Sequence, residues 1–288
     1  MNSIIIKTKK DLLYETTLSN LGFITTTIQV GDIVEFDKIE EELNSKDFFT
    51  AFVRTSTHFQ YEIAKRCASR CKIVFIDING FRSAQEWEDI KKEFPYTRFI
   101  LLKNNMWNSN ISDFKKLIPD TKAINIKCLN KNKLNSLDYW NTIKGFSFGG
   151  TSRDILPHLL SIFVSLNDDF AESVATETIL KRNLSLSDIK KYIPGPGLIY
   201  DVDDYFNVSY QSKIICNLEA DWKSNKTDVK NIEFILNDDT SSLFDIDYNE
   251  ESSYSRMISN CVQNLSNEGF WSYHYLIDEW ILKQIENL

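Results

Sequence analysis

Short apolar runs alternate with amphipathic stretches over the first 120 residues of the chain. The runs are rich in Ile, Val and Phe, as the buried strands of a parallel sheet are, and the stretches between them repeat apolar residues at helical spacing. This alternation predicts a sheet built from βαβ units. The expected strands are residues 3–7, 24–30, 48–53, 73–77 and 98–103, and the expected helices are residues 10–21, 37–44, 58–70, 83–94 and 111–118.

The pattern changes after Pro119, and the second half of the chain reads as a mixture of helices and antiparallel strands. A helix is expected over residues 154–166, directly after the Gly149-Gly150 pair. Strand-like stretches then dominate residues 171–247, several of them alternating apolar and polar positions, which is typical of strands with one covered face. We therefore expect an antiparallel sheet in this half.

Two further segments of the second half have a recognisable pattern. Pro194-Gly195-Pro196-Gly197 predicts a rigid turn, because proline cannot donate to a strand ladder and glycine supplies unusual dihedral angles. Residues 270–288 predict a closing helix with an aromatic face. Together the patterns predict an α/β protein with a Rossmann-like parallel domain over residues 1–120. An α+β domain with a mainly antiparallel sheet is expected over residues 121–288.

Composition and charge narrow the range of functions. The chain has 288 residues, of which 42% are apolar, which is enough for two soluble domains with real cores. Its net charge of −8 repels phosphate backbones and anionic lipids, so no nucleic-acid or membrane partner is expected. No apolar run reaches the roughly 18 residues of a membrane span, and the apolar triplet near the start precedes its lysines, unlike a secretory signal. We expect a cytoplasmic protein.

Cysteine and histidine are too few and too scattered for a metal site. The five cysteines form no Cys-x-x-Cys pair, so neither a disulfide framework nor a zinc ribbon is predicted. Three histidines make a His-rich site improbable. No metal is therefore expected.

The turn after the first predicted strand contains no glycine, and the first glycine of the chain is Gly22. A dinucleotide-binding turn needs glycine for its tight bend and for the close approach of its backbone to the pyrophosphate. Lys7, Thr8, Lys9 and Lys10 can supply polar and positively charged groups for a phosphate instead. The alternative is an ordinary solvated basic turn.

Two ordered motifs resemble those of the Gfo/Idh/MocA family, the relatives of glucose-fructose oxidoreductase and inositol dehydrogenase. Thr55-Ser56-Thr57-His58 is similar to the family's Pro-Thr-x-x-His turn, with Arg54 where proline is common. Downstream, Gly149-Gly150-x-x-x-Asp154-x-x-x-His158 is similar to a second family motif, spacing included. The resemblance spans nearly the whole chain. It implies a Rossmann-like fold, NAD(P), a sugar-like ligand and pairing of copies through the second-domain sheet.

The resemblance also implies roles for particular residues. Thr55 and Asp77 would lie beside the cofactor, and His158 would act as acid/base or hydrogen-bond partner to a sugar hydroxyl, positioned by Asp154. Asp154 can instead be a helix N-cap, because Pro157 places the start of a helix nearby, and His158 can be a packing residue.

Further candidates for ligand binding are His58 and the aromatic residues Tyr61, Trp107 and Trp140, which can form walls for a sugar ring. For His58 we favour a structural role, as a residue in the first turn of a helix. With 37 aromatic residues in the chain, most aromatic side chains must belong to the core.

One departure from the family pattern matters most for function. The family's Glu-Lys-Pro positions fall on Asp77, Ile78 and Asn79, so isoleucine replaces the lysine used beside substrate and nicotinamide. Isoleucine can donate neither a proton nor a charge-assisted hydrogen bond. The leading hypothesis is a relative that has lost or altered nicotinamide-dependent hydride transfer. The alternative is an active NAD(P)-dependent oxidoreductase on a sugar, sugar nucleotide or polyol.

Overall fold

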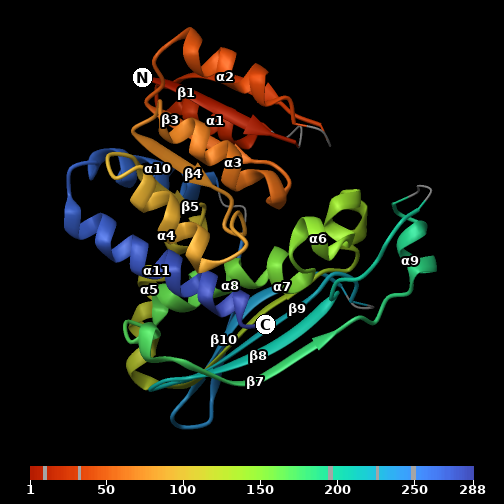
Figure 1. Cartoon of the computed structure of the whole chain (residues 1–288). Helices are drawn as coiled ribbons and strands as arrows, with labels where there is room; N and C mark the ends of the chain where they lie inside the picture. The colour runs from red at the N-terminus through yellow and green to blue at the C-terminus, as the bar shows by residue number, and fades with distance from the viewer. Residues whose placement is uncertain (9–11, 32–33, 194–196, 225–226, 248–250) are drawn as a thin grey trace. The chain divides into compact units, whose positions relative to one another are not determined.

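A computed structural model of the chain describes residues 1–8, 12–31, 34–193, 197–224, 227–247 and 251–288 (Figure 1). The chain forms two compact units. Unit 1 consists of residues 1–107 together with 250–286, and unit 2 consists of residues 108–249 with the last two residues. No helix among the described residues is long and apolar enough to cross a membrane.

Unit 1 is built on a parallel five-stranded sheet in the order β2-β1-β3-β4-β5 (Figure 1). The predicted Rossmann-like sheet is thereby confirmed, and the ends of the predicted strands and helices of residues 1–118 shift by at most three residues. The strands are β1 (Asn2–Lys7), β2 (Ile24–Gln29), β3 (Thr50–Arg54), β4 (Ile73–Ile76) and β5 (Arg98–Leu101). The helices are α1 (Leu13–Asn20), α2 (Phe36–Ser45), α3 (Thr57–Ala68), α4 (Ala84–Glu93), the short 3-10 helix η1 (Asn104–Trp107), α10 (Glu251–Gln263) and α11 (Glu268–Glu286).

The core of unit 1 explains why its strands read as continuous apolar runs. Ile5, Phe52, Phe75 and Ile100 extend from neighbouring strands into one buried cluster with side chains of α1 and α10. The residues between them are buried as well, because helices such as α3 pack against β3 and β4. Strands buried on both faces carry no polar alternation.

The C-terminal helices differ from the expected division into residues 1–120 and 121–288. The buried face of α10, with Tyr254, Met257 and Cys261, packs in the core of unit 1, and Trp271 of α11 belongs to the same cluster. The chain thus returns to its first unit after completing the second. Sequence periodicity predicted α11, but it did not indicate which core the helix would join.

Unit 2 contains a mixed six-stranded sheet in the order β11-β10-β6-β9-β8-β7. Its neighbours pair in antiparallel fashion except for β6 and β9, which are parallel, so the expected mainly antiparallel sheet is confirmed. The strands are β6 (Thr121–Leu129), β7 (Val174–Lys181), β8 (Tyr205–Gln211), β9 (Ile215–Asp221), β10 (Val229–Leu236) and β11 (Ser241–Asp245). The helices are α5 (Ile111–Leu117), α6 (Lys144–Ser147), α7 (Thr151–Asp154), α8 (Leu156–Leu166) and α9 (Leu186–Lys190).

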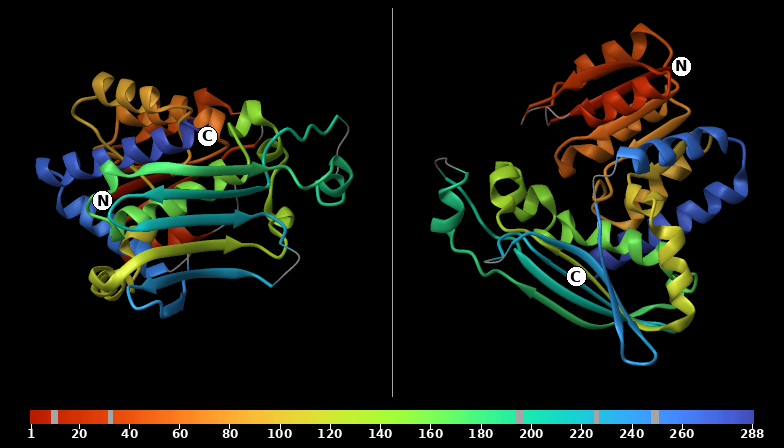
Figure 2. Two further views of the ribbon diagram at one scale, coloured as in Figure 1. Left: turned by 90° about the horizontal axis from the view of Figure 1, so that it is seen from below. Right: turned by 180° about the vertical axis from the view of Figure 1, so that it is seen from behind.

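The two faces of this sheet differ. Helix α8, nearly all of it buried, packs against β9, and α7 contacts β8. The other face is seen in the left panel of Figure 2, where no helix of the described part of unit 2 covers it. A polar ladder crosses this outer face: Ser209 donates to Asn217, Asn217 donates to Asn125, and Asn125 donates to Glu233. The predicted turn at residues 194–197 lies largely outside the described residues.

Candidate functional site

The carboxyl ends of β1, β3 and β4 meet at one edge of the sheet of unit 1. The strand order reverses between β1 and β3, and ligands of open α/β sheets bind beside such a reversal. Lys7 ends β1, Arg54 ends β3, and Asp77 follows β4. We call these three residues, with Glu15 of α1, the strand-end cluster.

Lys7 is buried and forms an ion pair with Glu15, which stands in the first turn of α1. The Thr27 hydroxyl donates to the same Glu15 oxygen at 3.1 Å. The first turn of a helix carries amide hydrogens without intrahelical partners and attracts negative charge. In this protein its own carboxylate supplies that charge, and the ammonium of Lys7 is neutralised by it.

Arg54 is paired in a similar way. Its Nε donates to Oδ1 of Asp77 at 3.2 Å, and its guanidinium lies 4.4 Å from the ring centroid of Tyr14. Arginine is suited to such combined stacking and ion pairing. The structure therefore brings together Lys7 and Asp77, two of the predicted cofactor residues. Each is ion-paired with an oppositely charged residue of the protein, Lys7 with Glu15 and Asp77 with Arg54.

Thr8 and Thr55 also lie at this edge. The Thr8 amide donates to the Arg54 carbonyl at 3.1 Å, and Thr55 is buried, with its hydroxyl on the Ser56 carbonyl at 3.3 Å. Lys9 lies outside the described residues. Ile78, at the position of the family's lysine, is 2% exposed. A charged side chain at that position would have to be buried.

Two of the described residues at this edge, Glu15 and Ile78, do not fit a dinucleotide bound in the usual way. A pyrophosphate seated at the first turn of α1 would meet the carboxylate of Glu15, and like charges at close range repel. Of the described residues at the strand ends, Lys7 and Arg54 already have carboxylate partners. The Ile78 side chain has no proton to donate.

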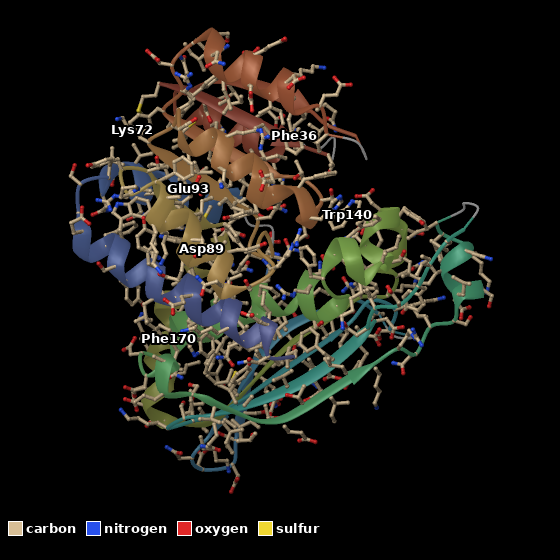
Figure 3. The ribbon with its side chains drawn as sticks, in the orientation of Figure 1. Phe36, Lys72, Asp89, Glu93, Trp140 and Phe170 are labelled. Atoms are coloured by element: carbon tan, nitrogen blue, oxygen red, sulfur yellow. The ribbon has the colours of Figure 1, made fainter. Side chains whose placement is uncertain are left out.

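The other predicted ligand residues of unit 1 pack against the protein. His58 is the second residue of α3, half-buried, with its ring centroid 3.9 Å from that of Phe59. Trp107 stacks on His274 of α11 at 5.2 Å between centroids, and its carbonyl accepts from Arg256 at 2.6 Å. In unit 2, Trp140 is half-buried in a 3-10 helix at residues 139–142 (Figure 3).

In unit 2 the Gly149-Gly150 motif has a steric explanation. The Asp203 carboxylate accepts from the Gly150 amide at 3.0 Å and from the Ser152 amide at 2.7 Å, and the Asp203 carbonyl accepts from the Thr151 amide. A Cβ atom on Gly150 would stand 1.7 Å from the Asp203 carbonyl oxygen. Only glycine allows this approach, which fixes the start of α7.

Asp154 ends α7, and it is not the N-cap of the next helix. That position belongs to Ile155, and Pro157 lies in the first turn of α8 as expected. The Asp154 carboxylate instead accepts two long-range hydrogen bonds at Oδ2, one from Lys133 and one from the indole Nε1 of Trp222 at 3.0 Å. The N-cap role expected as an alternative for Asp154 is thus wrong, because its carboxylate bonds to Lys133 and Trp222.

Lys133 and Trp222 reach Asp154 from the carboxyl ends of two parallel strands. Lys133 follows β6, Trp222 follows β9, and the Lys133 amide donates to the Trp222 carbonyl at 2.8 Å. Burial raises the pKa of the nearby Cys128 thiol, with Lys133 acting to lower it, so Cys128 is a neutral thiol at neutral pH. We call Lys133, Asp154 and Trp222 the junction cluster.

His158 lies in the first turn of α8, four residues after Asp154, and is half-buried. Its amide donates to the Ile155 carbonyl at 3.0 Å, and its own carbonyl accepts from the Ser161 hydroxyl at 2.7 Å. Both residues of the predicted pair are therefore held on a short rigid segment. A carboxylate and an imidazole on such a segment, with the Lys133 ammonium beside the carboxylate, can bind hydroxyl groups and exchange protons with them.

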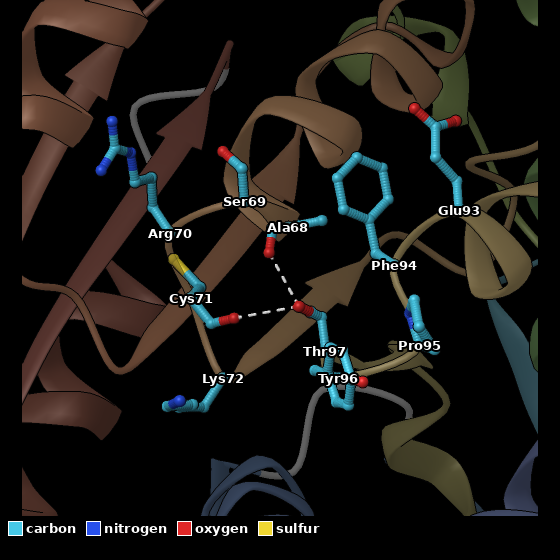
Figure 4. A pocket seen from close by; sticks show the side chains of 10 residues that line it. All are labelled: Ala68, Ser69, Arg70, Cys71, Lys72, Glu93, Phe94, Pro95, Tyr96 and Thr97. Atoms are coloured by element: carbon cyan, nitrogen blue, oxygen red, sulfur yellow. Dashed lines mark hydrogen bonds between the residues drawn. The ribbon is translucent and has the colours of Figure 1, made fainter.

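Two hollows lie away from the predicted residues. One, of about 410 Å³, is lined by residues 68–72 and 93–97 at the amino ends of β4 and β5, where the Thr97 hydroxyl donates to the Ala68 and Cys71 carbonyls (Figure 4). Burial raises the pKa of Cys71 to about 12, so its thiol is unreactive. This hollow is at the opposite edge of the sheet from the strand-end cluster.

The second hollow, of about 560 Å³, belongs to unit 2 and is acidic. Its lining includes Asp188, Glu219 and Asp221, and burial raises the pKa of Asp221. No group of three or more His, Cys, Asp or Glu side chains among the described residues is arranged to hold a metal ion.

Sequence reasoning missed Glu15, Lys133, Trp222 and Asp203. Strand β6 was not predicted, so the sequence did not indicate that the loop carrying Lys133 follows a strand and lies at the edge of a sheet. The partners of Asp154 lie 21 and 68 residues away along the chain. Of the four, only Glu15 left a local signal, as an acidic residue in the first turn of a predicted helix.

The sequence matches no protein-family model and no curated protein. Solved structures share its fold. GenD2 from gentamicin A biosynthesis, in complex with NAD, is 10% identical with a TM-score of 0.74, covering 99% of this chain and 92% of that one. A myo-inositol dehydrogenase from Corynebacterium glutamicum is 10% identical with a TM-score of 0.70, covering 100% and 94%. Levoglucosan dehydrogenase in complex with NADH and L-sorbose is 14% identical with a TM-score of 0.67, covering 99% and 87%. The chain has the fold of such dehydrogenases over its whole length.

Proposed function

We propose that this protein binds a sugar or polyol at the α7–α8 segment of unit 2 and does not transfer hydride to or from a nicotinamide cofactor. The observation that carries the proposal is the ion pair between Lys7 and Glu15 at the strand reversal of unit 1. It places a negative charge in the helix turn where a pyrophosphate would be held. The buried Ile78 supports the same conclusion, because it removes a proton donor.

The ligand class is supported by what the segment carries. Asp154 and His158 keep the motif of the sugar and polyol dehydrogenases, and the fold neighbours include a myo-inositol dehydrogenase and a levoglucosan dehydrogenase. In this proposal a ligand hydroxyl donates to Asp154 and exchanges a hydrogen bond with His158. Neither step uses a cofactor.

Titration with NADH and with NADPH, followed by nicotinamide fluorescence, tests the first half of the proposal. We expect no saturable change at millimolar cofactor. Micromolar binding of either would overturn the proposal and favour the second candidate, an active NAD(P)-dependent oxidoreductase. That candidate is supported by the retained Asp154 and His158 and by the NAD complex among the fold neighbours.

Ligand-observed NMR with myo-inositol, L-sorbose and levoglucosan tests the second half. Saturation transfer to at least one of them is expected, and transfer to none would contradict the assigned ligand class.

Pairing of two copies through the outer face of the sheet of unit 2 is part of the same proposal. Ile215 and Leu243, which are 42% and 62% exposed, lie on this face beside the polar ladder. Light scattering on the purified protein tests it, since a monomeric mass would contradict this pairing.

A further inference from the structure

The junction cluster contains a lysine that no motif indicated. The Lys133 ammonium is ion-paired with Asp154, and both side chains are about one-quarter exposed, at 25% and 24%. An ammonium group has three donors. In the part of the chain that the structure describes, the Asp154 carboxylate accepts one of them, so the other donors of Lys133 are available to a ligand or to water.

The cluster is rigidly held before any ligand arrives. The indole of Trp222, fully buried, donates to the same Asp154 oxygen as Lys133, and the Lys133 amide is bonded to the Trp222 carbonyl. Asn130 and Ser224 tie the same two loops together, through the Asn130 amide on the Asp221 carbonyl and the Ser224 amide on the Asn130 carbonyl. A lysine held in this way loses little side-chain freedom when it binds, which favours a functional contact.

We infer that Lys133 is a ligand-binding residue of unit 2, which supplies an ammonium group beside the Asp154 carboxylate. The inference rests on the proposed function, because it concerns the same ligand. A hydroxyl group is both a donor and an acceptor of hydrogen bonds, so it can donate to the Asp154 carboxylate and accept from the Lys133 ammonium. A neutral polyol fits this pair better than an acidic sugar, whose negative charge Asp154 would repel.

The test compares Lys133→Met, Lys133→Gln and Lys133→Arg with Lys131→Met. Lys131 is an exposed lysine of the same loop, and its backbone amide, not its side chain, donates to the Asp228 carboxylate. Affinities for myo-inositol, L-sorbose and levoglucosan are measured by NMR titration, and melting temperatures are measured alongside. We expect about tenfold to hundredfold weaker binding in the two uncharged variants, recovery in Lys133→Arg, and no change in Lys131→Met.

The outcomes separate the two proposals. Wild-type protein that binds a polyol while Lys133→Met and Lys133→Gln bind it equally well would overturn the role of Lys133 and leave the proposed function standing. Wild-type protein that binds none of the three polyols would overturn the proposed function and, with it, this inference. Melting temperatures close to wild type in all four variants show that lost binding is not lost folding.

Discussion

One lysine–aspartate pair of unit 1 and one of unit 2 differ in burial. In unit 1, Lys103 is paired with Asp278, and both side chains are fully buried. Burial lowers the pKa of Lys103 and raises the pKa of Asp278 to about 6. In unit 2, the paired side chains of Lys133 and Asp154 are each about one-quarter exposed.

The difference in burial decides whether a ligand can reach each ion pair. The Asp278 carboxylate also accepts from the Leu101 amide at 3.3 Å, so the buried pair joins β5 to α11 inside the core of unit 1. No ligand can reach it without opening that core. The junction pair is partly exposed to solvent, and one of its two members, Asp154, belongs to the same motif as His158. The buried pair therefore belongs to the core of unit 1, whereas the exposed pair is the one that we propose as a binding site in unit 2.

Breaking the buried pair is expected to give the largest effect. Lys103→Met leaves the Asp278 carboxylate in the core without its counter-charge, which costs about 3–5 kcal/mol in the free energy of unfolding. Lys133→Met costs less than about 1 kcal/mol, because water reaches the remaining carboxylate. Urea denaturation of both variants checks the contrast. Equal losses would contradict it, and Lys103→Met/Asp278→Leu should recover much of the stability.

The second prediction concerns the backbone that holds Asp154. Gly150→Ala forces a Cβ atom against the Asp203 carbonyl oxygen, and we expect a loss of roughly 2–3 kcal/mol as α7 shifts. Gly145→Ala is the matched control, since no atom lies within 4 Å of its added Cβ. The control should be neutral or slightly stabilising. Thermal denaturation measures the stability of both variants. A Gly150→Ala variant as stable as Gly145→Ala would show that the approach of Asp203 does not require glycine at position 150.

The smallest expected effect is a pH dependence confined to unit 1. Burial, with Lys103 nearby, lowers the pKa of His274 to about 2, and its Nδ1 has no hydrogen-bond partner among the described residues. Above about pH 6.5 the imidazole is neutral in both states, but below it only the unfolded chain takes up the proton. His274 therefore lowers stability by about 1.4 kcal/mol per pH unit as the pH falls below 6.5.

Asp278 titrates in the same range with the opposite sign. Its raised pKa makes the folded protein take up a proton first, which adds stability as the pH falls through about 6. The contribution of His274 is therefore read from the difference between wild type and His274→Phe in urea denaturation at about pH 7 and about pH 5.5. An identical pH dependence in both proteins would show that His274 is protonated in the fold.

Much of the architecture was readable from local patterns. Buried strands such as β1 and β4 are continuous apolar runs, and α4 repeats Trp87 and Ile90 toward the core, so periodicity alone located them. Strand β6 was not predicted, although its residues 124–128 alternate apolar and polar positions. The expectation that one helix over residues 154–166 carries both Asp154 and His158 is wrong, because Asp154 ends α7 and His158 lies in α8, with a break at Ile155. Their joint role in binding a ligand stays a prediction.

What the sequence determined by itself is the order and type of the elements over residues 1–118, the absence of glycine from the first turn and the isoleucine at position 78. These are properties of single residues and of their nearest neighbours along the chain. Only the tertiary structure decided that Glu15 neutralises Lys7, that Asp203 requires glycine at position 150, and that Lys133 reaches Asp154. Such contacts arise because sheet pairing brings strand ends together across long stretches of chain, and no local pattern records which charges will meet there.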